Sequence, residues 1–173
     1  MELYEAITTR RSVRSFQEGQ VADATLEKLL RAAMLAPSAA NQQPWKFIVV
    51  RDRAKLNGIT AFHPYCKMIT QVSVAIIVCG DPTGKKWANL WPQDCSAAVQ
   101  NLLLAARNEG LGAVWTGVYP LEDRMAGCRK LFGIPDHVFP FAVIPIGYPQ
   151  DPALAFKEMD RYKPELVYRD SYK

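Results

Sequence analysis

The spacing of hydrophobic residues predicts several amphipathic helices in this chain. Between residues 26 and 34 the apolar positions recur at intervals of three and four, at Leu26, Leu29, Leu30, Ala33 and Met34. We expect a helix there that Asp23 caps and that ends before Pro37, because proline disfavours helical geometry in the residue that precedes it. Helices are also expected at 3–8 and at about 121–132, the second of them ended by Gly133.

Residues 93–109 give the strongest helical prediction. The middle of this segment is apolar nearly all round, and a helix with that pattern is buried on every side. Gly110 follows and supplies the C-terminal stop. From residue 149 onward, charged residues and tyrosines follow no periodic apolar face, so the tail at 149–173 is expected to lie across another surface. The buried helix and the tail together predict a dimer.

Two apolar runs rich in β-branched residues, at 47–50 and 74–78, predict strands. Both runs are apolar on both faces, which is typical of strands in the middle of a covered sheet. Further strands are expected around 113–116 and 141–147. Helix and strand patterns therefore alternate without repeats or low-complexity segments, and residues 1–173 are expected to form a single domain.

Composition supports one folded domain and excludes other classes of protein. Of the 173 residues, 49% are hydrophobic and 22% are charged, which is typical of globular proteins. No apolar run approaches the roughly 20 residues that cross a bilayer. Residues 1–5 carry acids where a secretion signal has cations and then an apolar stretch. We therefore expect a cytoplasmic protein without a membrane segment.

Charge and cysteine content argue against nucleic-acid binding and zinc binding. The net charge is only +4, and the one tight cationic cluster is Arg10, Arg11 and Arg14, whereas a nucleic-acid binder usually has a dense basic face. The four cysteines form no Cys-x-x-Cys pair and there are two histidines, so neither a zinc site nor a disulfide framework fits. Cys79 and Cys95 are expected in the core of a protein from a reducing compartment.

Three motifs that suggest chemistry do not meet its requirements. The segment 80–86 is one residue too short for a phosphate-binding loop and has lysine where Ser or Thr should hold magnesium, so we interpret it as a turn. The segment 110–115 lacks the third glycine of a dinucleotide fingerprint and follows a helix. His63 and Cys66 have no nearby acid or second histidine to orient them, which favours a surface histidine and a packed cysteine.

An arginine-rich segment near the N-terminus could bind a phosphate. In an extended chain Arg10, Ser12 and Arg14 point to one side, and guanidinium groups bind phosphate with two hydrogen bonds at once. On this segment alone, a solvated basic turn is the simpler interpretation.

Two later segments could lie against a flat ligand. Residues 36–45 combine small residues with amides that could read the edge of a heterocycle, although an ordinary loop with Trp45 in the core is also compatible. Residues 111–120 end a strand, where backbone N–H groups are expected to be free at Thr116, Gly117 and Val118 and glycine allows close approach to a ring. A tight strand-to-helix turn explains this segment equally well.

Taken in order, the motifs point to one family. They are Arg-Arg-Ser-x-Arg, Pro-Ser-Ala-x-Asn-x-Gln-Pro-Trp, Gln93-Asp94-Cys95 with Gln100-Asn101, Gly-Leu-Gly-x-x-Trp-x-Gly, and Asp160-Arg161-Tyr162-Lys163-Pro164. Over residues 3–168 this order resembles the nitroreductase family of FMN-dependent oxidoreductases. The resemblance implies an α+β fold in which helices flank a mixed central sheet. It also implies an intertwined homodimer with FMN at the subunit interface, in which the helix from Gln93 forms the dimer core and the tail packs on the partner.

The resemblance also implies which residues contact FMN. The N-terminal arginines and serine would hold the phosphate, the ribityl chain and the pyrimidine edge, and the cations near residue 161 would close on the phosphate. The 37–43 loop would come from the other subunit, residues 116–117 would face N5 and O4, and Lys67 would lie near the pyrimidine. The complete set is Arg10, Arg11, Ser12, Arg14, Pro37, Ser38, Ala39, Asn41, Gln43, Lys67, Thr116, Gly117, Arg161 and Lys163.

The chain departs from the family pattern at two positions. Pro64 stands where some members have an asparagine that reads the flavin edge, so Asn41 or Gln43 would have to supply that contact. The acidic residue that the family places beside the ring is also missing, and Thr116 lies in that stretch.

The function that the resemblance implies is a ping-pong hydride transfer. NAD(P)H would reduce flavin N5, leave, and be replaced by a nitroaromatic, quinone or related small-molecule acceptor, with no catalytic side chain and no metal. Two alternatives stay open, namely a flavin-binding or redox-sensing module with little turnover, and another flavin reaction such as reductive dehalogenation or flavin cleavage.

The segment 82–92 is the expected lid over the substrate. Trp87 and Trp91 could enclose an aromatic acceptor between them, and Lys85 and Lys86 could attract its negative groups. A mobile basic loop with Trp91 packed on the dimer is the alternative interpretation.

Overall fold

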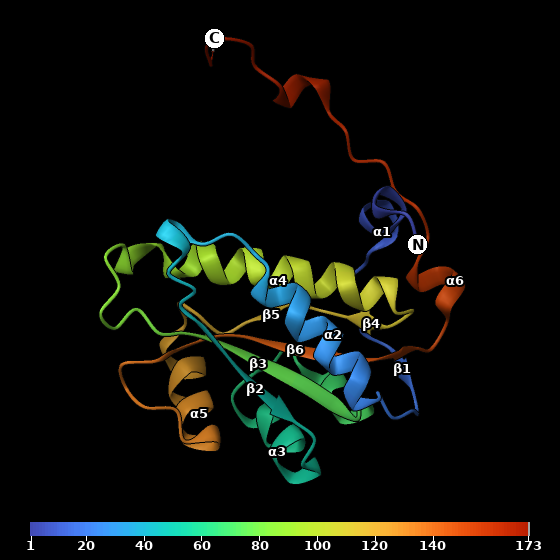
Figure 1. Cartoon of the computed structure of the whole chain (residues 1–173). Coiled ribbons are helices and arrows are strands. Elements are labelled where there is room, and N and C mark those ends of the chain that lie inside the picture. The colour runs from blue at the N-terminus through green and yellow to red at the C-terminus, as the bar shows by residue number, and fades with distance from the viewer. Residues whose placement is uncertain (173) are drawn as a thin grey trace.

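The longest strand, β6, organises the sheet of this protein, which a computed structural model describes over residues 1–172 (Figure 1). Strand β6 pairs with β3, β3 pairs with the edge strand β2, and three short strands also pair with β6. Pairing between these strands is antiparallel, and within residues 1–172 a parallel contact is found only at the bridge between Ser12 and Ala113. The strands are β1 (Phe16–Gln17), β2 (Trp45–Val50), β3 (Val74–Gly80), β4 (Gly112–Ala113), β5 (Thr116–Gly117) and β6 (Phe139–Pro149).

Helices cover both faces of the sheet, as expected for the α+β class (Figure 1). One face packs on α2 and α4, and the other packs on α3 and α5 together with the short 3-10 helices at Ile59–Ala61 and Lys67–Gln71. The α-helices are α1 (Leu3–Thr9), α2 (Asp23–Met34), α3 (Arg53–Gly58), α4 (Trp91–Asn108), α5 (Glu122–Phe132) and α6 (Pro152–Ala155). Further 3-10 helices lie at Ala39–Asn41, Ala88–Leu90 and Pro164–Leu166.

The two predicted central strands have different positions in the sheet. Strand β3 is buried throughout, and successive residues such as Ile76 and Ile77 face the two opposite cores. The prediction was wrong for β2, which forms the edge of the sheet and leaves Val49 41% exposed. An apolar run specifies a strand, but its place in the sheet depends on partners far away in the sequence.

The predicted strand at 113–116 is divided into β4 and β5. Both keep one register against β6, with Ala113 opposite Ile146 and Thr116 opposite Val143. That register places Val114 opposite Pro145, which has no N–H to donate, so the ladder is interrupted between the two short strands.

The helices agree with the predicted segments, with one correction at a cap. Helix α2 has Ala22 at its N-cap without a side-chain hydrogen bond, so the capping role predicted for Asp23 was wrong. Asp23 instead accepts a hydrogen bond from Arg51 at 2.7 Å. Gly110 and Gly133 follow α4 and α5 with φ of 72° and 67°, as expected for glycines that end helices.

Helix α4 is not buried on every side within one chain. Leu102 and Val99 face the sheet and are fully buried, whereas Gln100 is exposed and Ala97 and Leu104 are partly exposed. The expectation of burial all round was therefore wrong for the single chain, because one stripe of the helix has no partner in it.

The C-terminal tail leaves the body of the protein after α6 (Figure 1). Residues 157–172 are exposed throughout. This agrees with the expectation that the tail has no core of its own. Within residues 1–172, no helix is long and apolar enough to span a membrane. The exposed apolar side chains of the tail are Met159, Tyr162, Leu166, Val167, Tyr168 and Tyr172.

Candidate functional site

Three guanidinium groups gather where α1 meets the tail. Arg10, Arg11 and Arg161 line a cavity of about 270 Å³ together with Tyr4, Thr8 and residues 159–162. Burial lowers the pKa of Arg10, and the charges of Arg11 and Arg161 lower it further. Within residues 1–172, neither Arg10 nor Arg161 has a carboxylate at ion-pair distance. An anion here would relieve the repulsion, so this cluster suits a phosphate.

Arg11 has a second task that the sequence did not indicate. Its guanidinium donates to the carbonyl oxygens of Thr8 at 2.9 Å and Arg10 at 2.8 Å, and also to that of Lys157. It therefore ties the end of α1 to the tail that carries Arg161. Lys163 lies farther along the tail and is exposed.

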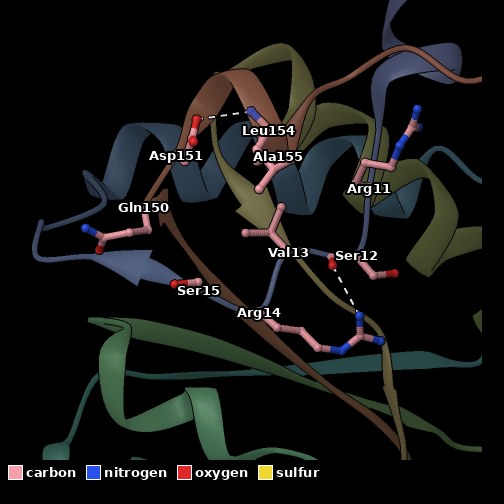
Figure 2. Close-up of a pocket in the computed structure, with 9 residues that line it drawn as sticks. All are labelled: Arg11, Ser12, Val13, Arg14, Ser15, Gln150, Asp151, Leu154 and Ala155. Atoms are coloured by element: carbon pink, nitrogen blue, oxygen red, sulfur yellow. Dashed lines mark hydrogen bonds between the residues drawn. The ribbon is translucent and has the colours of Figure 1, made fainter.

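The segment after Arg11 is extended along β4, as the candidate phosphate site requires. Val13 donates its N–H to the carbonyl of Ala113 at 3.1 Å. Val13 is buried, while Ser12 and Arg14 are exposed, and Arg14 reaches back to the Ser12 carbonyl at 3.3 Å. Figure 2 shows the resulting groove of about 450 Å³, in which residues 11–15 face residues 150–155.

Strand β5 exposes backbone and not the Thr116 side chain. The Thr116 hydroxyl is buried and donates to the Val143 carbonyl at 2.7 Å. Gly117 is open, since a Cβ added to it would meet no atom within 4 Å. Val118 donates its N–H to the Phe141 carbonyl, so the expectation of a free N–H at Val118 was wrong. A flat ligand could approach the chain at Gly117.

His63 lies in the core, which corrects the expectation of a surface histidine. It is 1% exposed, and its Nε2 lies 2.9 Å from the carbonyl oxygen of Gly117. Burial lowers the pKa of His63. Cys66 is packed, as expected, with its sulfur 3.6 Å from the Thr116 hydroxyl, and burial raises its pKa. Lys67 is exposed and directly follows Cys66, the residue that contacts β5.

Burial also keeps the other three cysteines protonated and inert. Cys79, Cys95 and Cys128 are buried free thiols, and burial raises the pKa of each to about 12. The core positions expected for Cys79 and Cys95 are confirmed. Segment 80–86 contains a turn, as predicted, in which Lys85 donates its N–H to the Pro82 carbonyl.

The loop between α2 and β2 is held in an unusual conformation. Ala40, Asn41 and Gln43 have φ of 49°, 53° and 47°, a region that residues other than glycine rarely adopt. Internal hydrogen bonds join the Gln43 N–H to the Ser38 hydroxyl and the Gln43 amide to Asn41, both at 3.0 Å. These contacts place Ser38, Asn41 and Gln43 together, while Pro37 is exposed.

Asp94 anchors that loop, a role that sequence reasoning missed. Its buried carboxylate accepts the N–H of Ala39 at 2.9 Å. An acidic residue in the first turn of a largely buried helix was the available signal, because aspartate is rarely buried without a partner.

The two groups of candidate residues lie at opposite ends of α4 (Figure 1). Asp94 holds the 37–43 loop near the start of the helix, and Arg107 donates to the Thr9 hydroxyl at 2.8 Å near its end. Asp94 and Arg107 are thirteen positions apart, which corresponds to about 20 Å of helix. One chain therefore does not bring the loop to the arginine cluster.

The two lid tryptophans line one small pocket, which is too tight to admit a water molecule. Trp87 is 49% exposed and lies beneath the Lys86 ammonium. Trp91 is 6% exposed and packs in the core, with its ring 5.4 Å from that of Phe139 and 4.7 Å from that of Tyr119. Trp91 is therefore packed in the single chain, and Trp45 is buried as expected.

Comparison with known proteins identifies close relatives. The sequence profile of the nitroreductase family matches residues 7–75 and 64–148. A relative from Methanothermobacter thermautotrophicus, named as a candidate NADH dehydrogenase/NAD(P)H nitroreductase, is 56% identical over 151 residues, which is 87% of this chain and 79% of the relative.

Solved structures with the same fold cover nearly the whole chain. The structure of a protein of the same name from Parabacteroides distasonis has a TM-score of 0.91 at 42% identity and covers 98% of both chains. A nitroreductase from Desulfovibrio desulfuricans, solved in complex with FMN, has a TM-score of 0.82 at 29% identity and covers 100% of this chain and 99% of that one.

Proposed function

The chain belongs to the nitroreductase family, and on that premise we propose that it is an FMN-dependent oxidoreductase that takes hydride from NAD(P)H and reduces small-molecule acceptors such as nitroaromatics and quinones. The observation that carries the proposal is the unpaired arginine cluster around Arg10, on a segment that contacts β4 at Ala113, four residues before the open backbone at Gly117. The names of the relatives support the choice of cofactor and reductant.

The residues present fit FMN at both of its ends. The cavity of Arg10, Arg11 and Arg161 supplies the cationic donors that a terminal phosphate requires. Gly117 leaves room for a flat ring against backbone, and Ser12 is bridged to Ala113, four residues before Gly117. When bound, FMN supplies the hydride chemistry at its N5. Arg14 and Lys67 are exposed cations that would favour negative charge on the pyrimidine.

The proposed site needs two copies of the chain. The 37–43 loop lies about 20 Å along α4 from the arginine cluster, so both reach one flavin only if a second chain packs its α4 in the opposite direction. The part-exposed side chains of Ala97 and Leu104 on α4 give such a partner an apolar surface. The exposed apolar residues of the tail offer a second surface for the same partner.

A visible absorption spectrum before and after NADPH, recorded without oxygen, tests the proposed function. We expect a yellow protein whose colour bleaches within seconds, and light scattering should give the mass of a dimer. A yellow protein that NADPH and NADH leave unchanged would indicate a flavin-binding or sensing module. A colourless protein that takes up no added FMN would overturn the proposal.

Replacing Trp87 with alanine should raise KM for an aromatic acceptor about tenfold, because a half-exposed ring contributes roughly 1.5 kcal/mol of stacking. The rate of flavin reduction by NADPH should not change. The backbone N–H of Trp87, which donates to Gln42 at 3.0 Å, is retained in this variant. Steady-state kinetics with a nitroaromatic gives KM, and Trp87→Phe is the matched control. Equal KM values for Trp87→Ala and the wild type would remove Trp87 from the substrate site.

A further inference from the structure

The carbonyl oxygen of Gly117 accepts two hydrogen bonds from outside its own strand. His63 Nε2 lies 2.9 Å away and Arg124 Nη1 lies 2.7 Å away. His63 comes from the segment before the Lys67–Gln71 3-10 helix, and Arg124 comes from the first turn of α5. Two elements distant in sequence therefore converge on one backbone atom of β5.

This arrangement requires one tautomer of His63. Since Nε2 must donate to a carbonyl, the proton of a neutral imidazole is on Nε2 and Nδ1 is an acceptor. Nδ1 is buried without a hydrogen-bond partner. A buried nitrogen without a partner lowers stability, so packing alone would favour an apolar side chain at this position.

Arg124 contacts an aromatic ring as well as the Gly117 carbonyl. Its guanidinium lies 5.4 Å from the centre of the Tyr65 ring, two residues beyond His63. Burial and the Arg124 charge both lower the pKa of His63, which keeps the imidazole neutral. The pair thus presents one neutral and one charged donor to the same oxygen.

We propose that His63 and Arg124 are positioning residues, which fix the backbone of β5 at Gly117 so that it faces the flavin ring in one orientation. The inference rests on the proposed function, since Gly117 matters here as the open backbone beside FMN. Without the two donors, the Thr116–Gly117 strand would be held by its short ladder to β6, by the Thr116 hydroxyl and by the hydrogen bond from the Val118 N–H to the Phe141 carbonyl. A ring that depends on this orientation would then bind less tightly and in a different electrostatic environment.

The test uses variants that remove or keep a donor. Arg124→Met and His63→Phe remove the donors, whereas Arg124→Lys and His63→Gln keep one. Arg129 in the same helix is the matched control, because Arg129→Met removes hydrogen bonds to the carbonyls of Asp136 and Val138, away from β5. Each full-length variant is titrated with FMN by flavin fluorescence, the absorption maximum of the bound flavin is recorded, and Tm is measured without FMN.

We expect Arg124→Met and His63→Phe to weaken FMN binding about tenfold and to shift the flavin absorption band. Arg124→Lys and His63→Gln should restore most of the affinity. Arg129→Met should lower Tm but keep the wild-type Kd and spectrum.

Two results would overturn the inference. One is a Kd and spectrum in Arg124→Met that match those of the wild type. The other is a loss of affinity in Arg129→Met as large as that in Arg124→Met. Wild-type protein that binds no FMN would instead overturn the proposed function and the inference with it.

Discussion

Replacing Arg10 with alanine should weaken FMN binding about a hundredfold. Arg10 is one of three guanidinium groups around a cavity without a paired carboxylate in the described chain, and a charged hydrogen bond to phosphate contributes about 1.5–3 kcal/mol. A loss of about 2.7 kcal/mol corresponds to a factor of 100 in Kd. Titration with FMN and with riboflavin, which has no phosphate, measures the effect.

The riboflavin titration separates loss of the phosphate contact from general damage. Affinity for riboflavin should stay within about twofold of the wild type, because only the phosphate contact is removed. Tm without FMN should not fall, since the substitution relieves repulsion from Arg11 and Arg161. Arg31→Ala, which changes an exposed arginine paired with Glu27 on α2, is the control and should bind FMN normally. Equal losses for FMN and riboflavin would show that Arg10 does not bind the phosphate.

Replacing Gly80 with alanine should destabilise the protein by about 3 kcal/mol, the upper range for overpacking a core. A Cβ at this position would lie 2.1 Å from Cε3 of Trp91 and 2.7 Å from its Cδ2. The Trp91 ring cannot withdraw, because the rings of Tyr119, Phe139 and Phe141 surround it at 4.7–5.7 Å. For a chain of this length Tm should fall by roughly 6–12 °C, as measured by thermal unfolding.

Gly117→Ala is the matched control for stability. The same methyl group added at Gly117 meets nothing within 4 Å, so Tm should change by less than about 2 °C. If Gly80→Ala and Gly117→Ala unfolded at the same temperature, the packing of Trp91 against Gly80 would not limit stability.

The helices and strand β3 could be predicted because their signals are local. The spacing of Leu26, Leu29 and Ala33 determines which face of α2 is buried wherever the helix packs. The glycines after α4 and α5 end those helices through their own backbone preference. These features depend on residues within a few turns of one another.

The errors concern residues whose environment is set by distant segments. His63 lies in the core beside Gly117 and Arg124, and Trp91 contacts aromatic rings from β6 and the 119 region. No periodic pattern in the sequence around either residue predicts these contacts with distant segments. Likewise, β2 lies at the edge because the sheet order places β3 and not β2 beside β6.

The candidate site was predictable from the sequence only in part. The Arg10 to Arg14 segment alone favoured a solvated basic turn, and the resemblance was needed to predict a phosphate site there; the segment is extended along β4. Arg161, some 150 residues away in the sequence, reaches Arg10 because the tail passes beside α1. Its role at the phosphate was predicted from the resemblance alone. The contacts of Asp94 and Arg124 with backbone groups were not foreseen at all.

The separation of the two half-sites along α4 has a genetic consequence. Defects near Arg10 and defects in the 37–43 loop lie at opposite ends of the helix. In the proposed dimer, a chain damaged at one end and a chain damaged at the other assemble one intact site and one doubly damaged site. In such a dimer, substitutions would sort into two complementation groups, and a mixed population of two inactive chains would recover part of the activity that each has lost.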